Sequence, residues 1–255
     1  MISVLDIYNF IDSISPFESQ MDFDNSGLLV GNFESNISKV LVSLDITKEV
    51  ISECKEIGAN LIISHHPVIF HPIRNLYSDD VPYILVKNQI SAICAHTNLD
   101  LSPIGVNFCL FNSLKLKNKT PLSYYKDKYD FGYYGILENE MSCSEFASFV
   151  KKSLKCERIR FTQISDKIKT VAICSGASGS LVYEACKNKC DAFVTGEIKH
   201  SDILFANEHK ISIFDVGHFK SENVVIPYLK DILQNKFPTI KFYESFVLTD
   251  KIQFL

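Results

Sequence analysis

The sequence predicts an α/β fold made of two similar halves, and three observations support this prediction. Short apolar segments alternate with segments of helical periodicity along most of the chain. The same alternation occurs before and after a polar, lysine-rich stretch at residues 114–130. The apolar segments contain few polar residues, as is typical of parallel strands that helices cover on both faces. We therefore expect an internal duplication that gives two three-layer α/β domains.

The first half begins with an amphipathic helix at residues 3–14, where Ser3 is a suitable N-cap and Pro16 ends the helix. A turn at the Asp-Asn-Ser-Gly sequence of residues 24–27 follows. Strands and helices then alternate as strand 39–45, helix 47–58, strand 59–64, helix 80–89 and strand 90–96.

The second half repeats this plan with strand 169–175, helix 178–190, strand 191–197, helix 201–209 and strand 211–218. The tail at residues 239–247 alternates enough to form a last strand that returns to the first domain. Residues 114–130 are the best candidate for a linker. The predicted boundaries are 1–124 for the first domain, with 222–255 packing back onto it, and 125–221 for the second.

Composition excludes several classes of function. The chain has 255 residues and a net charge of −4, with its basic residues scattered, which argues against nucleic-acid binding as a primary role. No apolar run approaches the length that spans a membrane, and residues 1–16 lack the features of a signal peptide. The eight cysteines include no C-x-x-C pair and read as reduced, buried thiols, so we expect a cytoplasmic protein.

Histidines and acids gather where the predicted strands end. In parallel α/β sheets, ligands bind beyond the carboxyl ends of the strands. The polar residues at these ends are His65 and His66, His96 and Asp100, Glu197 and His200, and His218 and Glu222. A single histidine at a strand end is usually structural, but repetition at four ends favours a site, because crowded polar groups without a ligand are costly to desolvate.

Imidazoles together with carboxylates suit zinc, iron, manganese, cobalt or nickel. His218 and Glu222 are four residues apart and can face one point on a helix. Adjacent side chains in an extended segment diverge, so His65 and His66 are expected to serve two ions. His71 and His209 are interpreted as structural or exposed residues.

Glu197 and His200 stay outside the predicted ligand set. Either can orient a ligand, contact a substrate, move a proton or simply stabilise a loop. The sequence SGASGS at residues 175–180 matches no phosphate-binding motif and indicates only a tight strand-to-helix turn. No setting typical of a serine or cysteine nucleophile occurs.

The motifs DNSGLLVG, SHHPVIF, AHTNLD, TGE and GHFKSE, in this order, resemble the NIF-three-like (DUF34, YbgI-like) family, whose members carry the label GTP cyclohydrolase 1 type 2 homolog. The resemblance covers nearly the whole chain. Phe23 departs from the pattern, because many relatives have Trp before Asp-Asn. This departure concerns local packing and not the metal ligands.

The resemblance implies a dinuclear metal site in a cleft between the two domains and assembly into a toroidal homohexamer. Transferred by motif, the ligands of two divalent ions are His65, His66, Asp100, His218 and Glu222. The implied activity is metal-dependent hydrolysis of a nucleotide such as GTP, in which Glu197 or His200 moves protons. The alternatives are a non-catalytic protein that carries a metal or a metallocofactor, and an interaction protein. The sequence identifies neither the metal nor the substrate.

Overall fold

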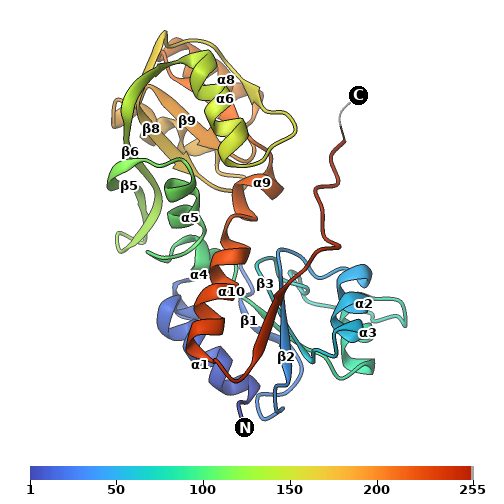
Figure 1. Cartoon of the computed structure of the whole chain (residues 1–255). Helices are drawn as coiled ribbons and strands as arrows, with labels where there is room; N and C mark the ends of the chain where they lie inside the picture. The colour runs from blue at the N-terminus through green and yellow to red at the C-terminus, as the bar shows by residue number, and fades with distance from the viewer. Residues whose placement is uncertain (254–255) are drawn as a thin grey trace. The chain divides into compact units, whose positions relative to one another are not determined.

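The computed structural model describes residues 1–253, which fold as two compact units (Figure 1). The first unit contains residues 1–99 and 226–251, and the second contains residues 100–225. The division falls inside the short helix α4 (Thr97–Asp100), whereas the predicted boundary is residue 124. Residues 101–124 belong to the second unit because helix α5 (Val106–Ser113) contributes Leu110 and Phe111 to its core.

The first unit contains a five-stranded sheet of order β1-β4-β3-β2-β11. Its strands are β1 (Gly27–Val30), β2 (Lys39–Ser43), β3 (Leu61–Ser64), β4 (Ser91–Cys94) and β11 (Lys241–Glu244). All neighbours are parallel except β1, which pairs antiparallel with β4. The predicted return of the chain tail to the first sheet is confirmed, because β11 pairs with β2.

Helices cover both faces of this sheet. Figure 1 shows α2 and α3 on one face and α1 and α10 on the other. Alternate strand residues point to opposite faces, so Leu41 and Ile62 pack with α2 and α3 while Val40 and Leu61 are buried on the other side. The helices of this unit are α1 (Val4–Ile14), the 3-10 turn η1 (Phe17–Ser19), α2 (Lys48–Glu56), α3 (Val81–Lys87) and α10 (Val225–Lys236).

Ser3 is the N-cap of α1, as the sequence predicts, and it forms a capping box with Asp6. The Ser3 hydroxyl accepts from the Asp6 amide at 3.2 Å, and the Asp6 carboxylate accepts from the Ser3 amide at 2.8 Å. We expect Ser3→Ala to lower the free energy of unfolding by about 1 kcal/mol, because the Asp6 amide loses its partner. Urea denaturation measures the difference, and Ser13→Ala, at the solvent-exposed end of the same helix, serves as the comparison.

The second unit contains a six-stranded sheet of order β5-β6-β8-β9-β10-β7. Its strands are β5 (Lys117–Tyr125), β6 (Tyr129–Ser142), β7 (Arg160–Phe161), β8 (Lys167–Cys174), β9 (Ala192–Thr195) and β10 (Ser212–Asp215). Strands β8, β9 and β10 are parallel to one another, and the outer strands run antiparallel to their neighbours.

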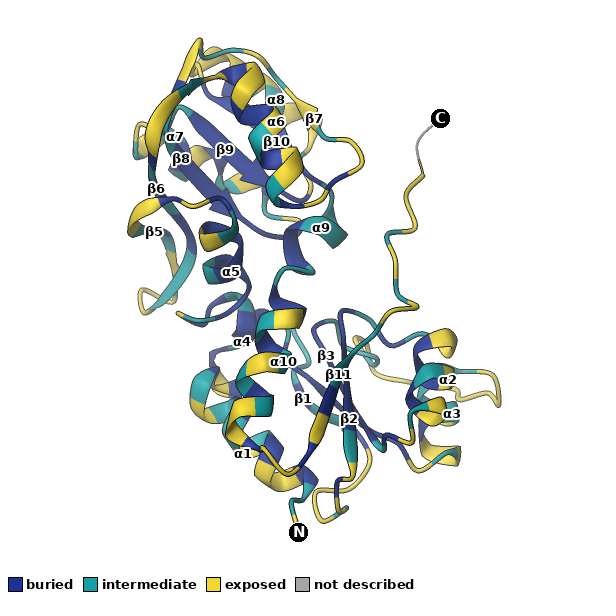
Figure 2. Cartoon of the chain, viewed as in Figure 1, coloured by how far each residue is buried: buried dark blue, intermediate teal, exposed yellow. Residues whose placement is uncertain are grey.

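Two apolar clusters lie on the two faces of this sheet. Val171 and Val194 pack with α5 and α6 (Cys143–Ser153), whereas Ala172 and Phe193 pack with α7 and α8. The remaining helical segments are η2 (Gly179–Leu181), α7 (Val182–Lys187), α8 (His200–Glu208) and α9 (His218–Glu222). Figure 2 shows the central strands of each sheet buried and the outward faces of the helices exposed.

The linker prediction for residues 114–130 is wrong. This stretch forms most of a β-hairpin, in which β5 pairs antiparallel with β6. Residues 126–128 form the turn, in which Lys126 and Asp127 have φ of 51° and 52°, the left-handed backbone that tight hairpin turns commonly contain. The stretch looks like a linker because much of β5 is exposed and therefore polar.

The predicted α/β class is confirmed. Each sheet contains a run of three parallel strands in chain order, β2-β3-β4 in the first unit and β8-β9-β10 in the second. The remaining strands differ in number and direction between the two sheets. Within residues 1–253, no helix has both the length and the apolar character needed to cross a bilayer.

Candidate metal centre

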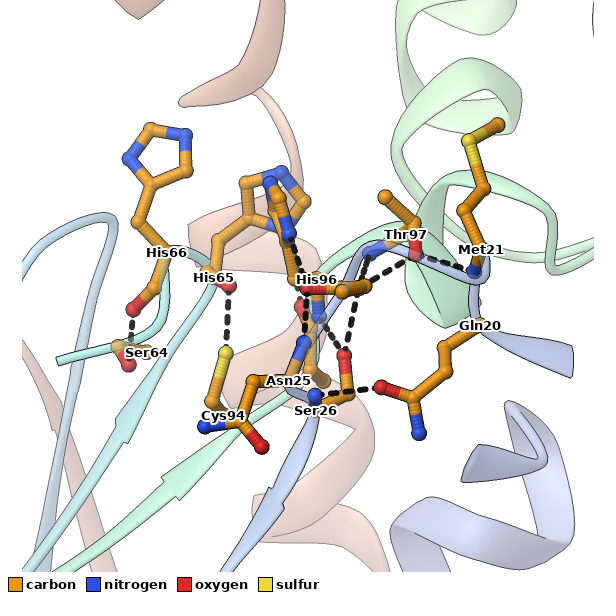
Figure 3. A network of polar contacts seen from close by, with 12 residues as sticks. Gln20, Met21, Asn25, Ser26, Ser64, His65, His66, Cys94, His96 and Thr97 are labelled. Carbon is orange, nitrogen blue, oxygen red and sulfur yellow. Dashed lines mark hydrogen bonds and ion pairs between the residues drawn. The ribbon is translucent and has the colours of Figure 1, made fainter. Parts of the chain in front are cut away.

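Three histidines converge at the carboxyl ends of β3 and β4 in the first unit. His65 and His66 follow β3 directly, and His96 lies just beyond β4, its parallel neighbour. Their ligand nitrogens lie within 4.8 Å of one another. His65 is buried, while His66 and His96 are half-buried. Figure 3 shows the three side chains extending from these two strand ends.

Each of these imidazoles is held through its Nδ1 atom. The partners are the Ala95 carbonyl for His65 at 2.9 Å, Asp45 for His66 at 2.7 Å and Asp24 for His96 at 2.7 Å. A carbonyl or carboxylate oxygen only accepts, so Nδ1 donates and the lone pair of the neutral ring lies on Nε2. An acceptor on the far nitrogen is the usual arrangement of a metal-ligating histidine, because it fixes the tautomer and the ring orientation.

Asp24 connects the turn before β1 to the end of β4. One carboxylate oxygen accepts from His96, and the other accepts from the Thr97 amide at 2.9 Å and from the Thr97 hydroxyl. Burial by itself raises the pKa of Asp24, but the hydrogen bonds that its carboxylate accepts from His96 and Thr97 outweigh this effect. The pKa therefore lies well below its ordinary value of 3.8.

This lowered pKa predicts a pH dependence of stability. A carboxyl group with a depressed folded-state pKa stabilises the fold above its unfolded pKa, and the stabilisation is lost as pH falls toward the folded pKa. We expect the free energy of unfolding of Asp24→Asn to fall less steeply below about pH 5 than that of the native protein. Urea denaturation at several pH values measures this. Asp79→Asn, at an exposed loop carboxylate, should retain the native slope.

The second unit contains a separate group of ligand types on helix α9. His218 begins this helix and Glu222 ends it, and His218 Nε2 lies 3.0 Å from the Glu222 carboxylate, as the spacing of four predicts. His218 Nδ1 lies 2.6 Å from the Glu197 carboxylate, which follows strand β9. Glu222 is buried, whereas Glu197 is exposed. Glu197 therefore holds His218 as Asp45 holds His66.

Asp100 lies beside this group. Its ligand oxygen lies within 4.8 Å of that of Glu222. The Asn107 amide donates to the Asp100 backbone carbonyl at 3.1 Å, and the Ser175 hydroxyl lies 3.5 Å from the Asp100 carboxylate. Gly176 passes so close to Glu222 that any side chain at position 176 would overlap with the Glu222 carboxylate.

Cys174, at the end of β8, is not a reactive group of this site. Burial raises the pKa of its thiol to about 12, and the nearby carboxylates of Asp100 and Glu222 also raise it. A thiol in this state is a poor ligand and a poor nucleophile at neutral pH. All eight cysteines are free, and seven of them are buried, which agrees with the reading from the sequence.

The predicted ligands thus fall into two groups, His65 with His66 in the first unit and Asp100 with His218 and Glu222 in the second. His200 begins α8 and is exposed, and its side chain makes no hydrogen bond or ion pair among the described residues. Sequence reasoning noticed His96 at a strand end but omitted it from the ligand set, and it missed Asp24 and Asp45. Asp45 follows β2 at the edge where His65 follows β3, so its position was a usable signal.

The donor chemistry of both groups fits a borderline divalent ion. Imidazoles and carboxylates that lie within a few ångströms of one another are the ligands that zinc, iron, manganese, cobalt and nickel share. The arrangement orients the rings of His66, His96 and His218 with three separate carboxylates. A carboxylate partner that orients each ring is typical of metal-ligating histidines and is not needed by a histidine that only contacts solvent.

Comparisons with known proteins find relatives that match nearly the whole chain. The model of the family Duf34/NIF3 (NGG1p interacting factor 3) matches residues 2–252. A Campylobacter jejuni protein named GTP cyclohydrolase 1 type 2 homolog is 38% identical over 235 residues, which cover 90% of this chain and 91% of that protein. A Clostridium perfringens protein of the same name is 32% identical over 261 residues, which cover 98% of this chain and 98% of that protein.

Solved structures show the same fold. A hypothetical protein of Staphylococcus aureus superposes with a TM-score of 0.91 at 30% identity, covering 99% of both chains. Reduced HcgD from Methanocaldococcus jannaschii superposes with a TM-score of 0.79 at 27% identity, covering 95% of this chain and 97% of that one. A Bacillus cereus protein related to NIF3 has a TM-score of 0.92 at 23% identity, covering 100% and 99%, and supports the fold alone.

Proposed function

Because the chain belongs to the Duf34/NIF3 family, we propose that it is a divalent-metal-dependent hydrolase with a dinuclear site and a nucleotide-type substrate. The observation that carries this proposal is the carboxylate–imidazole pairing at His66, His96 and His218, which fixes the orientation of each ring through its Nδ1 atom. The curated relatives named GTP cyclohydrolase 1 type 2 homolog suggest GTP or a related nucleotide as the substrate.

The proposed ligands of the two ions are His65, His66, Asp100, His218 and Glu222. We propose that the group of the first unit and the group of the second bind the same pair of ions, in a cleft between two domains that arose by duplication. When bound, two divalent ions supply Lewis-acid activation of water for attack on an electrophilic carbon or phosphorus. The buried Glu222 carboxylate contributes negative charge that offsets the charge of the ions.

Glu197 and His200 receive different roles in this proposal. Glu197 accepts from His218 Nδ1, so it is a positioning residue that orients a ligand. His200 lies exposed at the start of α8, three residues after Glu197, and we propose that it exchanges protons with solvent during turnover. Glu197→Gln should weaken metal binding, whereas His200→Gln should alter the pH profile of turnover and leave the metal content unchanged.

The assembly and the compartment follow from the same proposal. The family resemblance predicts a toroidal homohexamer, which light scattering of the purified protein checks by its molar mass. The reduced, buried cysteines support a cytoplasmic location.

Reconstitution of metal-free protein tests the hydrolase directly. Protein stripped by a chelator is loaded with each candidate ion in turn and incubated with nucleoside triphosphates and simple phosphoesters. We expect turnover of a nucleotide that the chelator abolishes and one ion restores. Full metal occupancy without turnover of any compound would contradict the hydrolase and favour the metal-carrying alternative.

A further inference from the structure

Two exposed aromatic rings lie beside the three histidines of the first unit. The side chain of Phe23 is 62% exposed and that of Phe70 is 39% exposed. The two ring centroids are 6.3 Å apart, and the Phe70 ring lies 6.3 Å from the His96 ring. A single exposed apolar side chain needs no explanation, but two that meet next to a group of candidate metal-binding histidines do.

The loops that present these rings are tied to the sheet. Before Phe23, the Met21 amide donates to the Thr97 hydroxyl at 2.9 Å, and after it Asp24 accepts from His96 at 2.7 Å. The Asn25 side-chain amide donates to the Ile69 carbonyl at 2.6 Å and thereby joins the two loops. The two loops that carry the rings are therefore held in place before a ligand arrives, which lowers the entropy cost of binding.

We propose that Phe23 and Phe70 form a stacking surface for a planar heteroaromatic ring, the base of a nucleotide, whose edge then faces His96. This inference rests on the proposed function and adds the residues that recognise the base of the nucleotide. Flat apolar faces bind any nucleobase by stacking, without a base-specific hydrogen-bonding motif. This explains how a chain without a recognisable guanine-binding motif can bind a nucleotide.

Leucine substitutions test the stacking surface, because leucine keeps an apolar side chain but removes the aromatic face. Calorimetric titration of the metal-loaded protein with GTP, ATP, CTP and UTP is compared with titration with tripolyphosphate, which lacks base and sugar. We expect Phe70→Leu to weaken nucleotide binding about ten-fold and to leave tripolyphosphate binding unchanged. Phe70→Tyr, which keeps the stacking face, should retain native affinity.

Phe33→Leu is the matched control. Phe33 is 38% exposed and packs edge-to-face on Tyr8, 5.0 Å away. Phe33 follows β1, which runs antiparallel to β4. It therefore lies near the start of β4, whereas His96 lies just beyond the end of β4. We expect this variant to bind nucleotides as the native protein does.

Three results would overturn the stacking surface: equal nucleotide affinity of Phe70→Leu and native protein, equal loss for nucleotides and tripolyphosphate, or no nucleotide binding by native protein. A change of molar mass in Phe70→Leu would instead assign the rings to a contact between subunits and would also overturn it. Metal content is measured in parallel. If the native protein does not bind metal, the proposed function is wrong. If it binds metal but gives one of the results above, only the aromatic site is wrong.

Discussion

Purified Glu222→Gln and His65→Ala are each expected to lose about one equivalent of metal or more per chain relative to the native protein, while remaining folded. Glutamine has nearly the shape of glutamate but lacks its charge, so Glu222→Gln removes a ligand from a buried position without leaving a cavity. His65→Ala removes an imidazole whose Nδ1 donates a hydrogen bond to the Ala95 carbonyl and whose Nε2 is the proposed ligand atom. Elemental analysis together with thermal melting measures both effects.

Two control variants separate ligand loss from a general effect of the substitution. His71→Ala removes an exposed loop histidine of the same unit, and Glu208→Gln removes an exposed carboxylate at the end of α8. Both should keep the native metal content. If His65→Ala and Glu222→Gln retain full metal content as well, the ligand assignment is wrong. Metal binding should also weaken at acidic pH, because protonated imidazoles do not bind cations.

Gly176→Ala is expected to weaken metal binding by about 10- to 100-fold, although position 176 carries no ligand. The added Cβ would overlap with the Glu222 carboxylate, which must then turn away. Gly176 also has a φ of +62°, so alanine adds backbone strain of about 1 kcal/mol. Titration of metal-free protein with zinc measures the affinity, and urea denaturation measures the strain.

Gly58→Ala distinguishes these two contributions. Gly58 has a φ of +69°, close to that of Gly176, but the nearest atom to an added Cβ is Lys39 Nζ at 3.7 Å. Alanine at position 58 therefore adds the strain without displacing a carboxylate. We expect both variants to be destabilised to a similar degree and only Gly176→Ala to bind zinc more weakly. Equal zinc affinity of the two variants would show that Glu222 does not need its present position.

Much of the fold was predictable from the sequence, because its signals are local. The capping box at Ser3 depends on residues three apart, and the strand that ends before His65 is an apolar run with a clear boundary. The hairpin that begins at Lys117 was missed because its exposed face is as polar as a linker, and its turn contains no glycine. Single-sequence patterns detect burial better than they detect pairing.

The features of the candidate site also separate into those that the sequence predicts and those that depend on tertiary structure. The sequence by itself determined which residue types end the parallel strands and that His218 and Glu222 face one point, since a helical spacing of four is a local property. Only the tertiary structure decided that Asp24 holds His96 and that Asp45 holds His66, residues 72 and 21 positions apart. Such partners depend on which strands become neighbours in the sheet, and strand order is set by packing of the whole domain rather than by local spacing.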